Sequence, residues 1–159
     1  MRPCPAAPTR HLAISVRSAN RAPEGSCVKR ILVVDDDPVA RELLSEVLQE
    51  QYSVVVACNG AEALDSMRER LPDTIVLDMM MPIMDGWTFL KAWRGDPAFA
   101  EIPVMVVSGE PQACEDGKQF GVHACLPKPF DMDSLLNAVG RLVRLTDRSD
   151  VGGPMPSAN

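Results

Sequence analysis

The sequence predicts an α/β fold, a five-stranded parallel sheet with helices on both faces. Short apolar runs rich in β-branched residues alternate with amphipathic segments five times along the chain. The apolar runs lack the polar alternation of a strand with one wet face, so they indicate strands that are buried on both faces. Parallel strands need long crossovers, and the amphipathic segments between the runs are long enough to supply them as helices.

The five apolar runs are the expected strands. They are too short to be helices, and turn residues such as Asp, Asn, Gly and Pro bound them. For five β-α units in series we expect the flavodoxin-like strand order 2-1-3-4-5. The strands are expected at Arg30–Val34, Ser53–Ala57, Thr74–Leu77, Pro103–Val107 and Ala124–Leu126.

The helices are marked by their caps and by apolar positions at helical spacing. Asp37 and Pro38 suit the N-cap and first position of a helix, Asn59 suits the next N-cap, and Asp131 suits the last. Helices are also expected at Trp87–Trp93, with both tryptophans packing, and at Pro111–Phe120. The inward positions of the first and last helices are expected to be Val39, Leu43, Leu44, Val47, Leu48, Leu135, Leu136, Val139 and Leu142.

Length and composition indicate one soluble domain between two tails. The chain has 159 residues, of which 46% are hydrophobic and 24% charged. Residues 1–27 and 146–159 lack periodicity, and we expect a disordered arm and a disordered tail around a domain at 28–145. The net charge is -6 although the arm is basic, so we expect no nucleic-acid binding. No apolar run is long enough for a membrane span, so a cytoplasmic location is expected.

The five cysteines show no pairing pattern. Their number is odd, and none forms a C-x-x-C pair. In a cytoplasmic protein this composition favours free thiols over disulfides or a zinc site. We therefore expect Cys125 to be a buried thiol.

Polar residues follow four of the five strands. Asp35–Asp37 follow the first strand, Asp78 the third, Ser108 the fourth and Lys128 the fifth. In open α/β sheets, ligands bind at the carboxyl ends of the strands. We therefore expect one pocket with several carboxylates, a hydroxyl and an ammonium.

Such a pocket is suited to phosphoryl transfer. Clustered carboxylates repel one another unless a cation joins them, and oxygen ligands suit Mg²⁺. Asp78 can then attack phosphorus as a carboxylate nucleophile, while Lys128 and Ser108 stabilise the transferring oxygens. Taken singly, these residues would be ordinary features: an acidic turn, a loop carboxylate and a surface lysine. Their joint occurrence at successive strand ends favours the site.

Four motifs at these spacings resemble the receiver domain of bacterial two-component response regulators: VVDDD, IVLDMMMPIMDG, VMVVSG and LPKPF. The resemblance covers Lys29 to Leu145. It implies that Asp78 is the phosphoacceptor, that Asp36 binds Mg²⁺ directly and Asp35 largely through water, and that the Met80 carbonyl completes the metal site. It also implies that Ser108 and Lys128 are the hydroxyl and lysine of the family, with a cis bond between Lys128 and Pro129.

One position departs from the family pattern. The family has an aromatic residue on the last strand, three residues before the lysine, and here that residue is Cys125. A small thiol cannot make the large packing change that an aromatic ring makes. Phosphorylation is therefore expected to be read out differently, through the helix at Pro111–Phe120 or the loop after Ser108.

The function expected from this resemblance is that of a stand-alone receiver. A histidine kinase or phosphotransfer protein would donate the phosphoryl group, and output would pass through contact with an unidentified downstream protein. Such a domain catalyses its own phosphorylation and dephosphorylation and is otherwise not an enzyme. A phosphatase with an aspartate nucleophile is the first alternative, but it expects an acid/base Asp at position 80, which is Met. A pseudo-receiver that only binds partners is the second, and the intact Asp78 and Lys128 argue against it.

Overall fold

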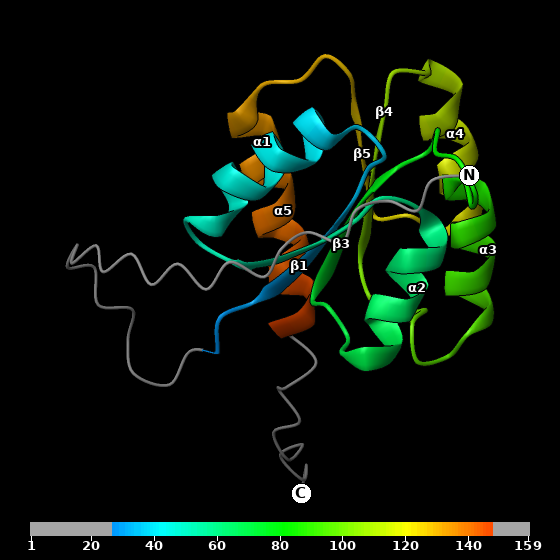
Figure 1. Cartoon of the computed structure of the whole chain (residues 1–159), viewed down its shortest axis with the longest axis horizontal. Helices are drawn as coiled ribbons and strands as arrows, with labels where there is room; N and C mark the ends of the chain where they lie inside the picture. The colour runs from blue at the N-terminus through cyan, green and yellow to red at the C-terminus, as the bar shows by residue number, and fades with distance from the viewer. Residues whose placement is uncertain (1–26, 148–159) are drawn as a thin grey trace, which may run out of the picture.

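The computed structural model describes residues 27–147, and it confirms the predicted fold. Five parallel strands lie in the order β2-β1-β3-β4-β5, with helices on both faces (Figure 1). The predicted arm, apart from Cys27, and the predicted tail from residue 148 onward lie outside the described residues. The last helix continues through Asp147, two residues beyond the expected end of the domain.

The strands lie close to their predicted positions. β3 and β4 each end one residue later than expected, so that Asp78 and Ser108 are the final residues of their strands. Asp78 pairs in register with Val107, and Ser108 pairs with Pro127. This register places three neighbouring strand ends at one edge of the sheet. The strands are β1 (Arg30–Val34), β2 (Ser53–Ala57), β3 (Thr74–Asp78), β4 (Val104–Ser108) and β5 (Ala124–Pro127).

The first two helices begin at their expected caps. The Asp37 carboxylate accepts a hydrogen bond from the Val39 N–H, and the Asn59 side chain accepts one from the Glu62 N–H. Asp85 caps the third helix by accepting from the Thr88 N–H. These bonds satisfy N–H groups that have no partner within the helix. The helices are α1 (Pro38–Gln49), α2 (Gly60–Glu69), α3 (Gly86–Gly95), α4 (Pro111–Phe120) and α5 (Met132–Asp147).

The sheet separates two apolar cores. Leu44 and Leu48 of α1 pack with Leu135 and Val139 of α5 against one face. Helices α2, α3 and α4 cover the other face (Figure 1), where Trp93 is 2% exposed. The strands β1, β3 and β4 contribute alternate residues to both cores, as expected of strands buried on both faces. Both tryptophans pack as predicted: Trp93 inside the core, and Trp87 half-buried with its ring centroid 5.9 Å from that of Phe120.

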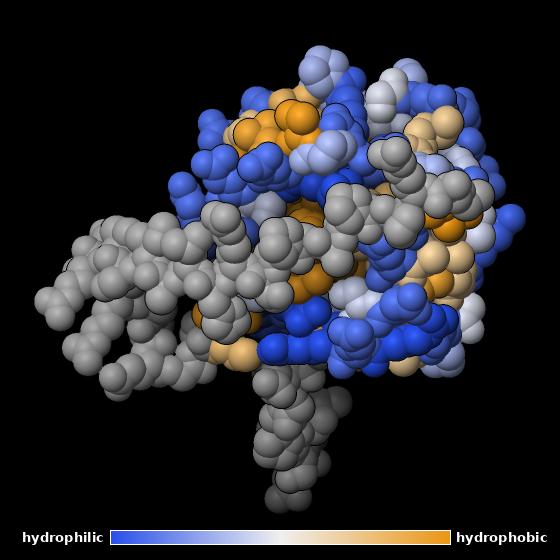
Figure 2. All heavy atoms as spheres, viewed as in Figure 1, coloured by the Kyte–Doolittle hydropathy of each residue, from blue (hydrophilic) through white to orange (hydrophobic). Residues whose placement is uncertain are grey.

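The predicted inward face of α1 is partly wrong. Val39 is 71% exposed and Leu43 is 46% exposed, whereas Leu44 and Leu48 are buried. The helix touches the sheet along the narrow row that contains Leu44 and Leu48, so the row of Val39 and Leu43 turns to solvent. Figure 2 shows hydrophobic residues on the surface in the region that α1 occupies in Figure 1.

The expectation of free thiols is wrong for two cysteines. Cys114 of α4 and Cys125 of β5 form a disulfide, with their Cα atoms 5.6 Å apart. The two lie 11 residues apart in sequence, in a helix and in the strand that follows it. No short motif marks such a pair, because it is the packing of α4 beside β5 that brings the sulfur atoms together. Cys58 is buried, as is usual for a structural thiol.

Charged residues meet at the amino ends of the strands, opposite Asp78 and Ser108. The Lys29 ammonium lies 3.5 Å from Asp73 and 2.6 Å from Asp147, and the Arg30 N–H donates to Asp73. These contacts join the start of β1 to the last residue of α5. No helix in residues 27–147 is long and apolar enough to cross a membrane.

Candidate phosphoryl-acceptor site

Three carboxylates meet at the carboxyl edge of the sheet. One oxygen from each of Asp35, Asp36 and Asp78 lies within 4.8 Å of the others. Asp35 directly follows β1, and Asp78 ends the adjacent strand β3. Asp35 is 2% exposed and Asp78 is 8% exposed, while Asp36 faces solvent. Solvent therefore reaches the cluster from the side of Asp36, while Asp35 and Asp78 are buried in the protein.

Lys128 brings an ammonium to this cluster. Its Nζ lies 3.3 Å from Asp35 Oδ2 and 3.8 Å from Asp78 Oδ1. The Lys128 N–H donates to the Ser108 carbonyl, which continues the β4–β5 ladder by one residue. The peptide bond between Lys128 and Pro129 is cis, as the resemblance implied. Among the described residues, this ammonium is outnumbered by the three carboxylates, so negative charge is in excess at the carboxylate oxygens.

The electrostatics of Asp78 reflect its burial and this excess of negative charge. Burial and the nearby charge of Asp35 raise the pKa of Asp78 to about 6 from an ordinary value of 3.8. Lys128 and a hydrogen bond from the Met79 N–H, 2.9 Å from Asp78 Oδ1, act in the opposite direction. A cation bound beside these carboxylates would favour the ionised form of Asp78 and so lower its pKa.

The backbone around Asp35 fixes its carboxylate. The Asp37 N–H donates to Asp35 Oδ1 at 2.9 Å, and the Asp35 N–H donates to the Ala57 carbonyl of β2. The Arg41 guanidinium donates to the Asp35 carbonyl at 2.7 Å. The sequence pattern did not predict this role of Arg41. Helical spacing alone does not show that a side chain reaches back over the start of its own helix.

Ser108 lies at the end of the strand that neighbours β3. It is 1% exposed, and its Oγ accepts a hydrogen bond from the Glu110 N–H at 3.1 Å. An oxygen that accepts this bond still has its own proton to donate. Ser108 therefore lies at the predicted edge, with its hydroxyl oriented by the turn that leads into α4.

Met80 lies in the loop that leaves β3. Its side chain is 59% exposed, while those of Met79 and Met81 are buried. The loop is held by a hydrogen bond from the Gly86 N–H to the Met79 carbonyl at 2.9 Å. A Cβ at Gly86 would lie 2.7 Å from Met79 Cα, so only glycine permits this close approach. The contact of Gly86 with the residue after Asp78 was not predicted from the sequence.

Comparisons with known proteins agree with this geometry. The model of the response regulator receiver domain matches residues 31–140. The response regulator MprA of Mycobacterium tuberculosis is 39% identical over 129 residues, which cover 79% of this chain and 55% of that protein. The DNA-binding dual master transcriptional regulator RpaA of Synechocystis is 38% identical over 75% of this chain and 51% of that protein. The chain thus spans about half the length of the curated relatives it matches.

Solved structures give the same result. The chemotaxis response regulator CheY4 of Vibrio cholerae has a TM-score of 0.68 and 33% identity, covering 73% of this chain and 99% of that one. The receiver domain of the Francisella response regulator 1452 has a TM-score of 0.68 and 31% identity, covering 74% and 98%. The fold, the carboxylate cluster at its edge and these similarities lead to one conclusion: the chain belongs to the receiver-domain family of response regulators.

Proposed function

We propose that this receiver accepts a phosphoryl group on Asp78 in a Mg²⁺-dependent step, from a phosphohistidine of a kinase or phosphotransfer protein. The observation that carries the proposal is the meeting of Asp35, Asp36 and Asp78 within 4.8 Å, with the Lys128 ammonium beside them. Nucleophile, charge partner and cation ligands are the parts that phosphoryl transfer needs.

The residues present fit a magnesium ion. Carboxylate oxygens at close range are hard ligands, and the exposed Asp36 leaves room for the waters that Mg²⁺ retains. We assign Asp35, Asp36, Asp78 and the Met80 carbonyl as the ligands. A bound Mg²⁺ would neutralise negative charge on the carboxylates and on the phosphoryl oxygens.

The protein groups then have separate roles. An oxygen of Asp78 forms a bond to phosphorus, and the bond from phosphorus to the donor histidine nitrogen breaks, leaving the nitrogen to take up a proton. Lys128 pairs with a phosphoryl oxygen as a point charge, and the Ser108 hydroxyl donates a hydrogen bond to another. Because Asp78 ends a central strand, the nucleophile is held by the sheet and not by a mobile loop.

Intact mass after incubation with acetyl phosphate and Mg²⁺ tests the proposal. We expect one added phosphoryl group on the wild type, and none on Asp78→Asn or in the presence of a chelator. Asp65→Asn is the matched control, because Asp65 is exposed on α2, and it should be phosphorylated like the wild type. Turnover of external phosphomonoesters would indicate a phosphatase instead. If neither phosphorylation nor turnover occurred, the chain would be a pseudo-receiver.

We further propose that output passes through contacts with another protein and not through DNA. The support is the acidic composition, with a net charge of -6 and a pI near 4.9, which disfavours contact with phosphates. RpaA is named as DNA-binding, but this chain matches only 51% of that protein. DNA binding is therefore tested with all 159 residues of this chain. A gel-shift assay on mixed genomic fragments should show no retardation with either the phosphorylated or the unmodified chain.

A further inference from the structure

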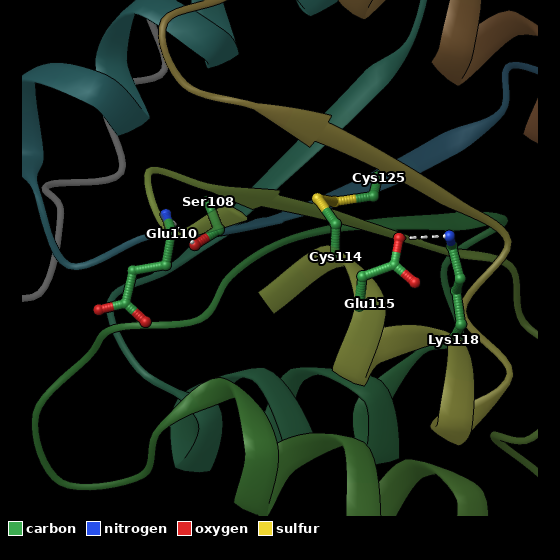
Figure 3. Close-up of a disulfide and its surroundings, with 6 residues drawn as sticks. All are labelled: Ser108, Glu110, Cys114, Glu115, Lys118 and Cys125. Carbon is green, nitrogen blue, oxygen red and sulfur yellow. Dashed lines mark hydrogen bonds and ion pairs between the residues drawn. A yellow bond between two sulfur atoms is a disulfide. The ribbon is translucent and has the colours of Figure 1, made fainter. Parts of the chain in front are cut away.

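We propose that Cys114 and Cys125 form a reversible thiol–disulfide site that fixes helix α4 to strand β5. Figure 3 shows the bond crossing from α4 to the strand. The Cα atoms lie 5.6 Å apart, a usual separation for a disulfide, so α4 and β5 need no rearrangement to form the bond.

The pair is open to reagents in solution. Both cysteines are half-buried, and they line a surface hollow of about 400 Å³. Cys58 differs, because it is only 9% exposed and its sulfur accepts a hydrogen bond from Asn59. Thiol exchange needs access to the attacked sulfur. Access therefore favours reaction at Cys114 and Cys125 over reaction at Cys58.

Helix α4 buries few large side chains, so the covalent bond adds to its attachment. The buried residues of the helix are Ala113 and Gly117, which bury little apolar area. Its N-cap residue, Glu110, makes no side-chain capping bond. Helix α3 buries Phe89, Leu90 and Trp93 by contrast. The other anchor of α4 is Phe120 at the end of the helix, which packs against Trp87 and the core, so the disulfide adds a covalent link nearer the start of α4.

The reaction balances with a small disulfide such as glutathione disulfide as the oxidant. One cysteine, as its thiolate, attacks a sulfur of the small disulfide and releases one thiol, which leaves a mixed disulfide on the protein. The second cysteine attacks the protein sulfur of that mixed disulfide and releases the second small thiol. The small disulfide gains two electrons and the two cysteine protons, and the protein gains one S–S bond. Excess thiol reverses the reaction.

A cytosolic setting would make such a pair transient. Cytosolic thiols are kept reduced by glutathione and thioredoxin, and the disulfides that do form there are usually catalytic or redox-sensing. The disulfide lies near the strand ends that hold the phosphoryl-acceptor site. Cys125 pairs in register with Val106, two residues before Ser108. The redox site nevertheless stands on its own contacts and does not depend on phosphorylation of Asp78.

The test uses the whole chain, oxidised with glutathione disulfide or reduced with dithiothreitol, and then alkylated and weighed. Of the five cysteines, two fewer should be alkylated in the oxidised form, and peptide mapping should join Cys114 to Cys125. Dithiothreitol should restore both thiols. Cys27→Ser, at an exposed cysteine outside the pair, is the matched control and should keep the linkage. Cys114→Ser should lose it.

Hydrogen exchange then measures how strongly the disulfide restricts the opening of α4. We expect backbone amides at residues 113–120 to exchange about tenfold more slowly in the oxidised form, while those of α1 stay unchanged. The proposal is overturned if glutathione disulfide forms no Cys114–Cys125 bond, or if α4 exchanges equally fast in both forms. Neither readout requires phosphorylation, so failure of the acetyl phosphate assay leaves this test intact.

Discussion

Asp78 is an acidic side chain held where its own charge is unfavourable. In the native state the pKa of Asp78 is raised to about 6, whereas in an unfolded chain it has the ordinary value of 3.8. The stability contributed by this group is therefore fully present below about pH 4 and is lost as the pH rises through 6. Without a cation, the ionised site lowers the free energy of unfolding at neutral pH.

Replacing Asp78 by asparagine should remove this cost. With chelator present at pH 8, we expect Asp78→Asn to raise the free energy of unfolding by on the order of 2 kcal/mol, and at pH 4 by close to nothing. Urea denaturation at the two pH values measures both. Asp65→Asn should change stability by less than about 0.5 kcal/mol at either pH. An equal gain at both pH values would show that charge is not the cause.

A cation should reverse the same cost. At a Mg²⁺ concentration ten times its dissociation constant, we expect the wild type to gain about 1.4 kcal/mol of stability, seen as a higher Tm. Asp36→Asn, which removes an exposed ligand and buries nothing, should lose most of that gain. Asp65→Asn should keep it. A gain that is equal in Asp36→Asn would place the ion elsewhere.

The site residues could be predicted because they occur at strand ends, where topology alone brings them together. Asp35, Asp78 and Lys128 meet as expected, and each could be placed from the strand before it. Arg41 and Gly86 could not, because their roles depend on backbone approach in three dimensions. The Cys114–Cys125 bond was missed for the same reason: its partners share no local pattern.

Helix α1 shows how far periodicity can define a buried face. The spacing of its apolar residues predicted one wide stripe, but only the row of Leu44 and Leu48 reaches the sheet. Which part of a wide stripe is buried depends on how the helix is rotated over its neighbours, and the sequence of one helix does not contain that information. Strand positions were predicted within one or two residues, because burial on both faces leaves a continuous apolar run.

Substitutions in α1 should separate the two rows. Val39→Lys should change the free energy of unfolding by less than about 0.5 kcal/mol, because Val39 is 71% exposed. Leu44→Ala should lower it by about 2–4 kcal/mol, because it opens a cavity under the helix. Urea denaturation of both variants checks the pair. A large loss for Val39→Lys would mean that this row is covered in solution.

The sheet makes two cores behave as one cooperative unit. Residues of β1, β3 and β4 supply both cores, so neither core can unfold while the other keeps its strands. We expect a single unfolding transition for the domain. This expectation applies to residues 27–147, the part of the chain that the structure describes.

The same sheet should insulate the cores from each other's cavities. Leu44→Ala lies in the core under α1 and α5, and Leu90→Ala lies in the core under α2 and α3. We expect their losses to add within about 0.5 kcal/mol in the double variant, because the two residues belong to separate core clusters. Thermal or urea unfolding of the two single variants and the double variant completes the cycle. Strong coupling would show that strain passes through the strands.

The ion pairs of Lys29 with Asp73 and Asp147 place both ends of the folded chain far from the carboxylates. β1 enters the sheet there and α5 finishes there, while the acidic cluster occupies the opposite rim. Five residues of strand span roughly 16 Å. A conformational change that passes from Asp78 to Lys29 or Asp147 must therefore cross the length of the sheet, whereas a partner bound beside the carboxylates could contact the changed site directly.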